Sequence, residues 1–207
     1  MAVDEGNCVH ACYLDISKAF DRVDHSILLQ KLQAHGIAGK LLNWLESYLQ
    51  DRFVQVQVDG ALSKKIATLS GVQQGSVLGP LLFLIYVNDI PKLTKCKIVL
   101  FADDIKLWVR VKSAEDCMDL QRDLDTLYHW SIQNRLPFNP KKCKMLLLGK
   151  PFHFTYQFGL DELEWTSDEK DLGAWILNSL KPMKQCQVVY NTASKLLGML
   201  KRIFRRF

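Results

Sequence analysis

The stretch KIVLFADDIKLWVRV, residues 97–111, places two adjacent acids between two apolar segments. Residues 97–101 and 105–111 are rich in branched and aromatic side chains, so we predict two strands joined by a tight hairpin around Ala102, Asp103 and Asp104. Neighbouring carboxylates repel each other, and burial would make both harder to ionise. A divalent cation could offset this cost, because Mg²⁺ prefers oxygen ligands. The alternative is an exposed turn, where aspartate is common.

A third carboxylate on a neighbouring strand would complete a site for two metal ions. Two ions about 3.5–4 Å apart can stabilise the attacking and leaving oxygens of an in-line phosphoryl displacement. Residues 11–16, ACYLDI, predict a buried strand that carries Asp15 near its end. Asp15 is therefore the best candidate for the third acid. An exposed strand end is its alternative, and spacing alone leaves both open.

The rest of the chain mixes helices and strands as an α+β sheet domain does. Asp24 is a candidate N-cap for a helix that Gly36 closes. Helical spacing also predicts helices over 41–49, from the glycine-bearing loop 70–80 to about residue 88, and over 114–135. We predict the remaining strands at 53–58 and 66–69 around the turn at Asp59 and Gly60, at 145–148, and near 152–158 and 171–177.

Composition limits the class of protein. The chain has 207 residues, 48% of them hydrophobic, and a net charge of +5. Residues 181–207 hold seven Lys or Arg and no acid, which suggests a polyanionic partner. The six cysteines lack zinc spacing, so we expect reduced thiols. The longest apolar run, 77–87, is too short to span a bilayer. We expect an intracellular protein, nuclear or cytoplasmic, without a membrane partner.

Five segments resemble reverse transcriptase motifs, in the order of that family. LDISKAFD (14–21), SGVQQGSVLGPLLF (70–83) and FADD (101–104) look like the first three palm motifs. LPFNPKKC (136–143) is similar to the fourth motif and KDLGAW (170–175) to the fifth. The wording is closest to jockey-like retrotransposons without long terminal repeats, and it extends over roughly residues 10–205.

This resemblance implies a fold. It implies an α+β polymerase palm, an antiparallel sheet backed by helices, with incomplete fingers and a truncated thumb. Residues 1–180 would be the palm with partial fingers, and residues 181–207 the basic start of a thumb helix. Phe101 stands where tyrosine is commoner in the family.

The resemblance also implies the metal ligands. Asp15 and Asp103 would coordinate two Mg²⁺ ions, with Mn²⁺ as an alternative ion. Asp104 would support the same cluster, and the backbone carbonyl of Ile16 would be an additional ligand.

Four further residues would contact the nucleotide. Phe20 resembles a bulky sugar gate that leaves no room for a ribonucleotide hydroxyl, whereas core packing is its alternative. Gln74 and Gly75 resemble the loop that supports the templating base and the incoming nucleotide, and a helix-entry turn is their alternative. Lys142 resembles a lysine near the departing pyrophosphate, with a solvated surface lysine as the alternative.

Primer and template contacts are implied near the end of the chain. Gly173 and Trp175 would belong to a primer grip, although Trp175 could also be a core residue. Lys201 and Arg202 lie in a basic stretch from Lys195 that resembles the first thumb helix and would touch backbone phosphates. A membrane-surface amphipathic helix is the alternative for this stretch.

The function implied is that of an RNA-directed DNA polymerase core. It would transfer nucleotides from dNTPs onto a DNA primer 3′-OH opposite an RNA template. Only fourteen residues precede Asp15 and the thumb stops early, so we expect weak or absent activity. The alternative is an inactive retrotransposon remnant that at most binds nucleic acid.

Overall fold

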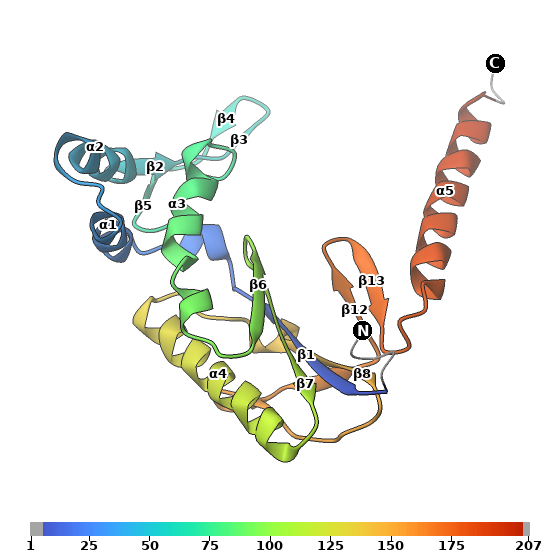
Figure 1. Cartoon of the computed structure of the whole chain (residues 1–207). Coiled ribbons are helices and arrows are strands. Elements are labelled where there is room, and N and C mark those ends of the chain that lie inside the picture. The colour runs from blue at the N-terminus through green and yellow to red at the C-terminus, as the bar shows by residue number, and fades with distance from the viewer. Residues whose placement is uncertain (1–5, 205–207) are drawn as a thin grey trace.

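A five-stranded sheet forms the centre of the molecule in the computed structural model, which describes residues 6–204 (Figure 1). Its strand order is β11-β8-β1-β7-β6. The strands are β1 (Cys8–Asp15), β6 (Lys97–Phe101), β7 (Asp104–Val111), β8 (Lys144–Gly149) and β11 (Glu164–Thr166). The first four pair antiparallel, as predicted, whereas β11 adds a parallel edge beside β8. The predicted α+β class is confirmed.

Alternation along β1 gives the sheet two different faces. Cys12 and Leu14 are buried on one face, while Tyr13 and Asp15 lie on the other. The first face packs on α4 (Ala114–Gln133), which lies beneath the sheet in Figure 1. The stripe that helical spacing predicts within residues 114–135 is buried: Cys117, Leu120, Leu124, Leu127 and Ser131. The second face is left for other contacts.

Three helices stand beside the sheet: α1 (His25–Ala34), α2 (Gly39–Leu49) and α3 (Leu78–Val87). As predicted, the Asp24 carboxylate caps α1, accepting a hydrogen bond from the Ile27 amide at 3.1 Å. Lys31 then joins α1 to the end of α3, because its Nζ donates to the Tyr86 carbonyl at 2.5 Å and to Asp89 at 3.0 Å.

The strand predicted over 53–58 is broken into two short hairpins. β2 (Arg52–Val54) pairs with β5 (Ile66–Thr68), and β3 (Gln57–Val58) pairs with β4 (Ala61–Leu62) around the predicted Asp59 turn. The valines at alternate positions remain 57–66% exposed: Val54, Val56 and Val58. Prediction of one continuous strand was wrong here, because the apolar side chains have no layer to pack against.

The last part of the chain rises above the sheet on the side opposite α4 (Figure 1). After the small hairpin of β9 (Gln157–Phe158) and β10 (Asp161–Glu162), a second hairpin forms from β12 (Asp168–Asp171) and β13 (Ala174–Leu177). It leads into α5 (Met183–Phe204), which has no buried residue. The helix begins twelve residues before the predicted Lys195, and the end of the predicted basic stretch, 205–207, lies outside the described residues.

Three short 3₁₀ helices complete the connections: η1 (Ala19–Arg22), η2 (Ile90–Lys92) and η3 (Pro140–Lys142). Of the helices within residues 6–204, none combines the length and the apolar character needed to cross a bilayer.

Candidate active site

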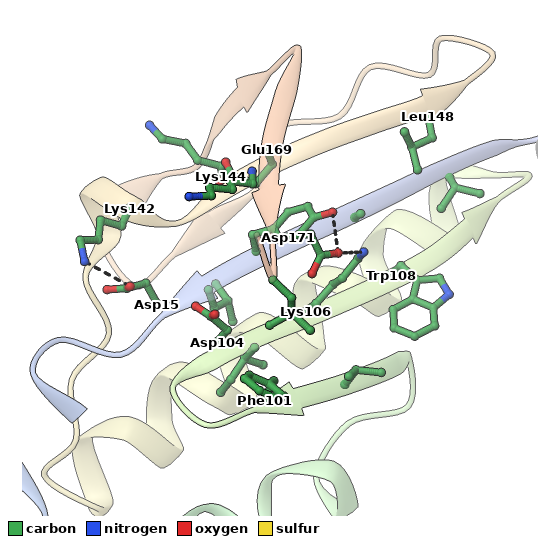
Figure 2. Close-up of a pocket in the computed structure, with 18 of the residues that line it drawn as sticks. Asp15, Phe101, Asp104, Lys106, Trp108, Lys142, Lys144, Leu148, Glu169 and Asp171 are labelled. Atoms are coloured by element: carbon green, nitrogen blue, oxygen red, sulfur yellow. Dashed lines mark hydrogen bonds and ion pairs between the residues drawn. The ribbon is translucent and has the colours of Figure 1, made fainter. Parts of the chain in front are cut away.

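Asp15 and Asp104 are direct cross-strand partners at the ends of β1 and β7. Directly opposite residues of an antiparallel pair point to the same face of the sheet, and here that face is the one away from α4. Figure 2 shows both carboxylates at the edge of one cavity. The two acids that the sequence separates by almost ninety residues are therefore neighbours.

Asp103 lies in the two-residue turn between β6 and β7. Phe101 pairs with Asp104 across this turn, and Ala102 has a positive φ of 52°. A positive φ at the first central position is the pattern of a type II′ turn, which suits the twist of a hairpin. The predicted hairpin is thus confirmed: Ala102 and Asp103 form its turn, and Asp104 begins β7.

One carboxylate oxygen of Asp15 has a hydrogen-bond partner, and the other has none. Oδ1 accepts a hydrogen bond from the Lys142 Nζ at 3.2 Å, and the carbonyl of Asp15 accepts one from the Asn139 amide at 2.8 Å. These contacts bring η3, from the predicted fourth motif, against the first acid. Oδ2 is buried and has no hydrogen-bond partner. A buried carboxylate oxygen without a donor is costly, so this atom is available to a cation.

Asp104 stands in a negative environment. Partial burial raises the pKa of its carboxyl group, and the neighbouring acids Asp103, Asp15 and Asp171 raise it further, whereas Lys142 opposes them. Like charges close together favour the protonated form unless a cation compensates. This is the electrostatic situation that the adjacent acids in the sequence suggested.

The donor chemistry fits a divalent metal ion, although the ligands are not gathered into a finished cluster. Among the described residues, no three His, Cys, Asp or Glu side chains form a group that could hold a metal ion as they stand. The free Oδ2 of Asp15 and the facing Asp104 are hard oxygen donors of the kind that Mg²⁺ takes. The three-acid metal centre stays a prediction.

Ile16 continues β1 through a single bridge to Phe138. The bridge uses the Ser17 amide and the Asp15 carbonyl, so the Ile16 carbonyl, the predicted additional ligand, is not one of its bonded groups.

Phe20 and Gln74 join the first two predicted motifs to each other rather than to the acids. The Phe20 ring stacks on Phe83 with centroids 4.8 Å apart, and its carbonyl accepts from the Val72 amide at 2.7 Å. The Gln74 amide donates to Asp21 Oδ1 at 3.1 Å. Gln74 and Asp21 line a separate cavity of about 550 Å³. Both the core-packing and the nucleotide-binding interpretations of Phe20 are compatible with its half-buried ring.

Two glycines that sequence analysis did not single out shape this loop. A Cβ on Gly71 would lie 2.9 Å from backbone atoms of Phe20 and Asp21, and one on Gly79 would lie 2.4 Å from the Gln73 carbonyl oxygen. Gly75, which was singled out, has a φ of +79° but no atom within 4 Å of such a Cβ. Its requirement is conformational rather than steric.

A cavity of about 790 Å³ extends from the acids along the sheet. Its floor is the exposed face of the sheet, and β12 forms one wall (Figure 2). Asp171, at the end of β12, forms an ion pair with Lys106 of β7 and accepts a hydrogen bond from the Tyr13 hydroxyl at 3.5 Å. Sequence analysis missed this contact. Lys106 and Tyr13 lie two residues from Asp104 and Asp15, a regular strand spacing that could have indicated a shared face.

The residues predicted to contact primer and template lie on the β12–β13 hairpin and on α5. Gly173 is in the hairpin turn with a φ of +89°. Trp175 packs under the base of α5, where the Lys184 Nζ lies 3.4 Å from its ring centroid and Gln185 accepts a hydrogen bond from its amide at 3.0 Å. Lys201 and Arg202 occupy the exposed last turn of α5, far along the chain from these contacts.

Comparison with known proteins identifies the family of this chain. The family model "Reverse transcriptase (RNA-dependent DNA polymerase)" matches residues 2–195. The RNA-directed DNA polymerase from the mobile element jockey of Drosophila funebris is 32% identical over 151 residues, 69% of this chain and 16% of that protein. The probable RNA-directed DNA polymerase from transposon BS of Drosophila melanogaster is 34% identical over 150 residues, 68% of this chain and 16% of that protein.

Among solved structures, a telomerase from Candida albicans, in complex with a fragment of telomeric RNA, is similar with a TM-score of 0.46 and 16% identity. The match covers 84% of this chain and 31% of that one. The chain spans about a sixth of the length of the two Drosophila relatives named above. Because the family model covers almost all of its residues, the chain belongs to the reverse transcriptase (RNA-dependent DNA polymerase) family.

Proposed function

We propose that this chain is the palm of an RNA-directed DNA polymerase, which adds deoxynucleotides to a primer 3′-OH opposite an RNA template. The observation that carries the proposal is the pairing of Asp15 with Asp104 at the edge of a cavity, in a chain of the reverse transcriptase family. In this proposal residues 1–180 form the palm with part of the fingers, and residues 181–207 begin the thumb.

Asp15, Asp103 and Asp104 would hold Mg²⁺, with Mn²⁺ as the alternative ion. The unpartnered Oδ2 of Asp15 and the crowding of negative charge around Asp104 support this assignment. Two bound ions supply charge stabilisation to the attacking and leaving oxygens of phosphoryl transfer. The protein contributes the fixed positions of its carboxylates, which two antiparallel strands hold at adjacent ends.

Lys142 would interact with the phosphates of the incoming nucleotide, near the departing pyrophosphate. Its Nζ forms an ion pair with Asp15 Oδ1 at 3.2 Å, although 63% of its side chain is exposed. A surface ion pair of this kind contributes little stability and exchanges partners readily. A cation held by Asp15 would leave Lys142 to interact with an anionic phosphate. Phe20 would limit the space at the sugar, and the loop at Gln74 and Gly75 would support the base pair.

Primer extension on an RNA template tests the proposal. With Mg²⁺ and dNTPs, the native chain should extend the primer only weakly, and Asp103→Asn and Asp104→Asn should each reduce that rate at least about 100-fold. Asp125→Asn is the matched control, because Asp125 is an exposed acid on α4, on the other side of the sheet. Equal extension by the native chain and by Asp103→Asn would reject catalysis at these acids.

Metal binding gives an independent measurement. The electron paramagnetic resonance signal of free Mn²⁺ should fall when native chain is added, and Asp15→Asn should weaken this binding at least about tenfold while Asp125→Asn does not. Binding that is the same for all three proteins would remove the metal site from the proposal.

A second candidate is nucleic-acid binding without catalysis. The basic, acid-free helix α5 favours it, because Lys184, Lys195, Lys201 and Arg202 carry the only charges between residues 183 and 204. Such binding should weaken steeply with salt. Salt-sensitive binding of a primer–template duplex, combined with no extension by the native chain, would select this candidate.

A further inference from the structure

The β12–β13 hairpin reaches the carboxylate site through one half-buried ion pair. The hairpin is a separate two-stranded sheet, with no ladder to the five-stranded sheet. Asp171, the last residue before its turn, forms an ion pair with Lys106, whose side chain is 31% exposed against 25% for Asp171. Figure 2 shows the Asp171 carboxylate bridging Lys106 and the strand that carries Asp15.

Asp171 contacts both of the strands that carry the facing acids, β7 and β1. Lys106 and Tyr13 are cross-strand partners, just as Asp104 and Asp15 are, and the acid pair lies two residues nearer the ends of β7 and β1. Asp171 binds both, since Lys106 forms the ion pair and the Tyr13 hydroxyl donates at 3.5 Å. Two residues along a strand span about 7 Å. The hairpin turn is therefore anchored about that far from the acids.

Charge makes Lys106 the suitable partner for this anchor. A carboxylate beside the acids would add repulsion, and Asp171 is among the groups that disfavour ionisation of Asp104. Lys106 cancels the charge of Asp171 at close range, and its Nζ also lies 4.9 Å from the centre of the Tyr13 ring. A charge-assisted hydrogen bond that is partly shielded from water fixes both distance and direction.

We propose that Lys106 and Asp171, with Tyr13, are positioning residues that set the distance between the hairpin turn and the acids. The inference rests on the proposed function and on the predicted primer grip at Gly173 and Trp175, which would hold the primer terminus. The pair touches neither nucleotide nor metal. It determines how closely the primer 3′-OH, held at the turn of Leu172 and Gly173, approaches the reacting phosphate.

Kinetics distinguish positioning from direct contact with substrate. Lys106→Met and Asp171→Leu should each lower kcat about 10–100-fold, because misplacement of a reacting group by about 1 Å is this costly. The KM for dNTP should change less than about threefold in both. Lys106→Arg should keep most activity, since it keeps the ion pair. The matched control is Arg122→Met, which removes an exposed ion pair with Asp119 on α4 and should leave both constants unchanged.

A double-mutant cycle tests whether the two residues act through each other. Combined Lys106→Met and Asp171→Leu should be no slower than the slower single variant. Multiplying losses would overturn the proposal, because Lys106 would then act on the substrate by itself. An increased KM with unchanged kcat would overturn it as well.

A distance measurement separates failure of the anchor from failure of the proposed polymerase activity. Spin labels at Ala174→Cys in the hairpin and at the exposed Met118→Cys on α4 can be placed in a chain carrying Cys96→Ala and Cys186→Ser, which removes the more accessible thiols. The distance distribution should be narrow, and Lys106→Met should broaden it whether or not the native chain extends primers. If Lys106→Met leaves the distance distribution unchanged, the proposed role of the ion pair is wrong. If Lys106→Met broadens the distribution but the native chain does not extend primers, only the proposed polymerase function is wrong.

Discussion

Helices α4 and α5 have similar lengths and amphipathic patterns but opposite surroundings. α4 has 20 residues and buries seven of them. α5 has 22 residues and buries none, and its apolar side chains, such as Leu196, Leu197 and Leu200, are 46–54% exposed. An amphipathic pattern predicts a helix, but tertiary packing supplies most of the stability of a helix. The five-stranded sheet and α4 thus form one packed unit, which we call the body. Helix α5, which we call the arm, is attached to it at its base.

The largest expected difference comes from truncating one leucine in each helix. Leu124→Ala in α4 should lower the free energy of unfolding by about 2–5 kcal/mol, because Leu124 is fully buried and its loss leaves a cavity. Leu197→Ala in α5 should change it by less than about 0.5 kcal/mol. Urea unfolding followed by fluorescence measures both. Similar losses for the two variants would show that α5 is part of the body.

Low pH should lower the free energy of unfolding of the body, because buried His10 must then take up a proton. This histidine is buried on β1, where its Nδ1 lies 2.8 Å from the Tyr156 hydroxyl and its Nε2 lies 2.9 Å from the Phe152 carbonyl. Burial lowers the pKa of His10 to about 4, although the hydrogen bond to the Phe152 carbonyl opposes this.

The sign of the effect follows from proton uptake. The unfolded chain, with a histidine pKa of about 6.5, binds a proton that the folded chain excludes. Stability is therefore complete above about pH 6.5 and falls towards pH 4, by up to about 3 kcal/mol. Urea midpoints between pH 7 and 4.5 measure this, and His10→Gln should flatten the slope. Residues 168–204 contain no histidine, so the helicity of α5 should not follow the same curve.

A buried carboxylate in α4 should matter more than an exposed one. Asp123 is 4% exposed and accepts hydrogen bonds from the amides of Lys95 and Cys96 at 2.7–3.1 Å. Asp123→Asn should cost about 1–3 kcal/mol, because hydrogen bonds to a charged group are stronger than neutral ones. Asp125→Asn, on the exposed side of the same helix, is the control and should cost less than about 0.5 kcal/mol. Equal unfolding midpoints for the two variants would contradict the role of burial.

The smallest expected effect is a local gain in the arm. Gly198 lies inside α5, and a Cβ there would meet no atom within 4 Å. Gly198→Ala should stabilise α5 by about 0.5–1 kcal/mol. Slower amide exchange within 183–204, with an unchanged global urea midpoint, is the expected result. A shift of the global midpoint would mean that the arm and body unfold together.

Local sequence patterns specify most of the helices, strands and turns of this protein. The turn between β6 and β7, the buried stripe of α4 and the Asp24 cap were predicted within a residue or two, because short-range periodicity and turn chemistry specify them. The order of the motifs also predicted the family, and the family model bears this out. Pro182 just before α5 was an unused signal for the start of that helix.

Contacts between residues far apart in the chain follow from the way the whole chain folds. Pairing of β1 with β7 placed Asp15 beside Asp104, and the return of η3 brought Lys142 to Asp15. The parallel edge strand β11, the Lys106–Asp171 ion pair and the exposure of α5 had no local signature. The physical reason is that such contacts depend on strand register and on which surfaces the whole chain can bury, and no short stretch of sequence contains either.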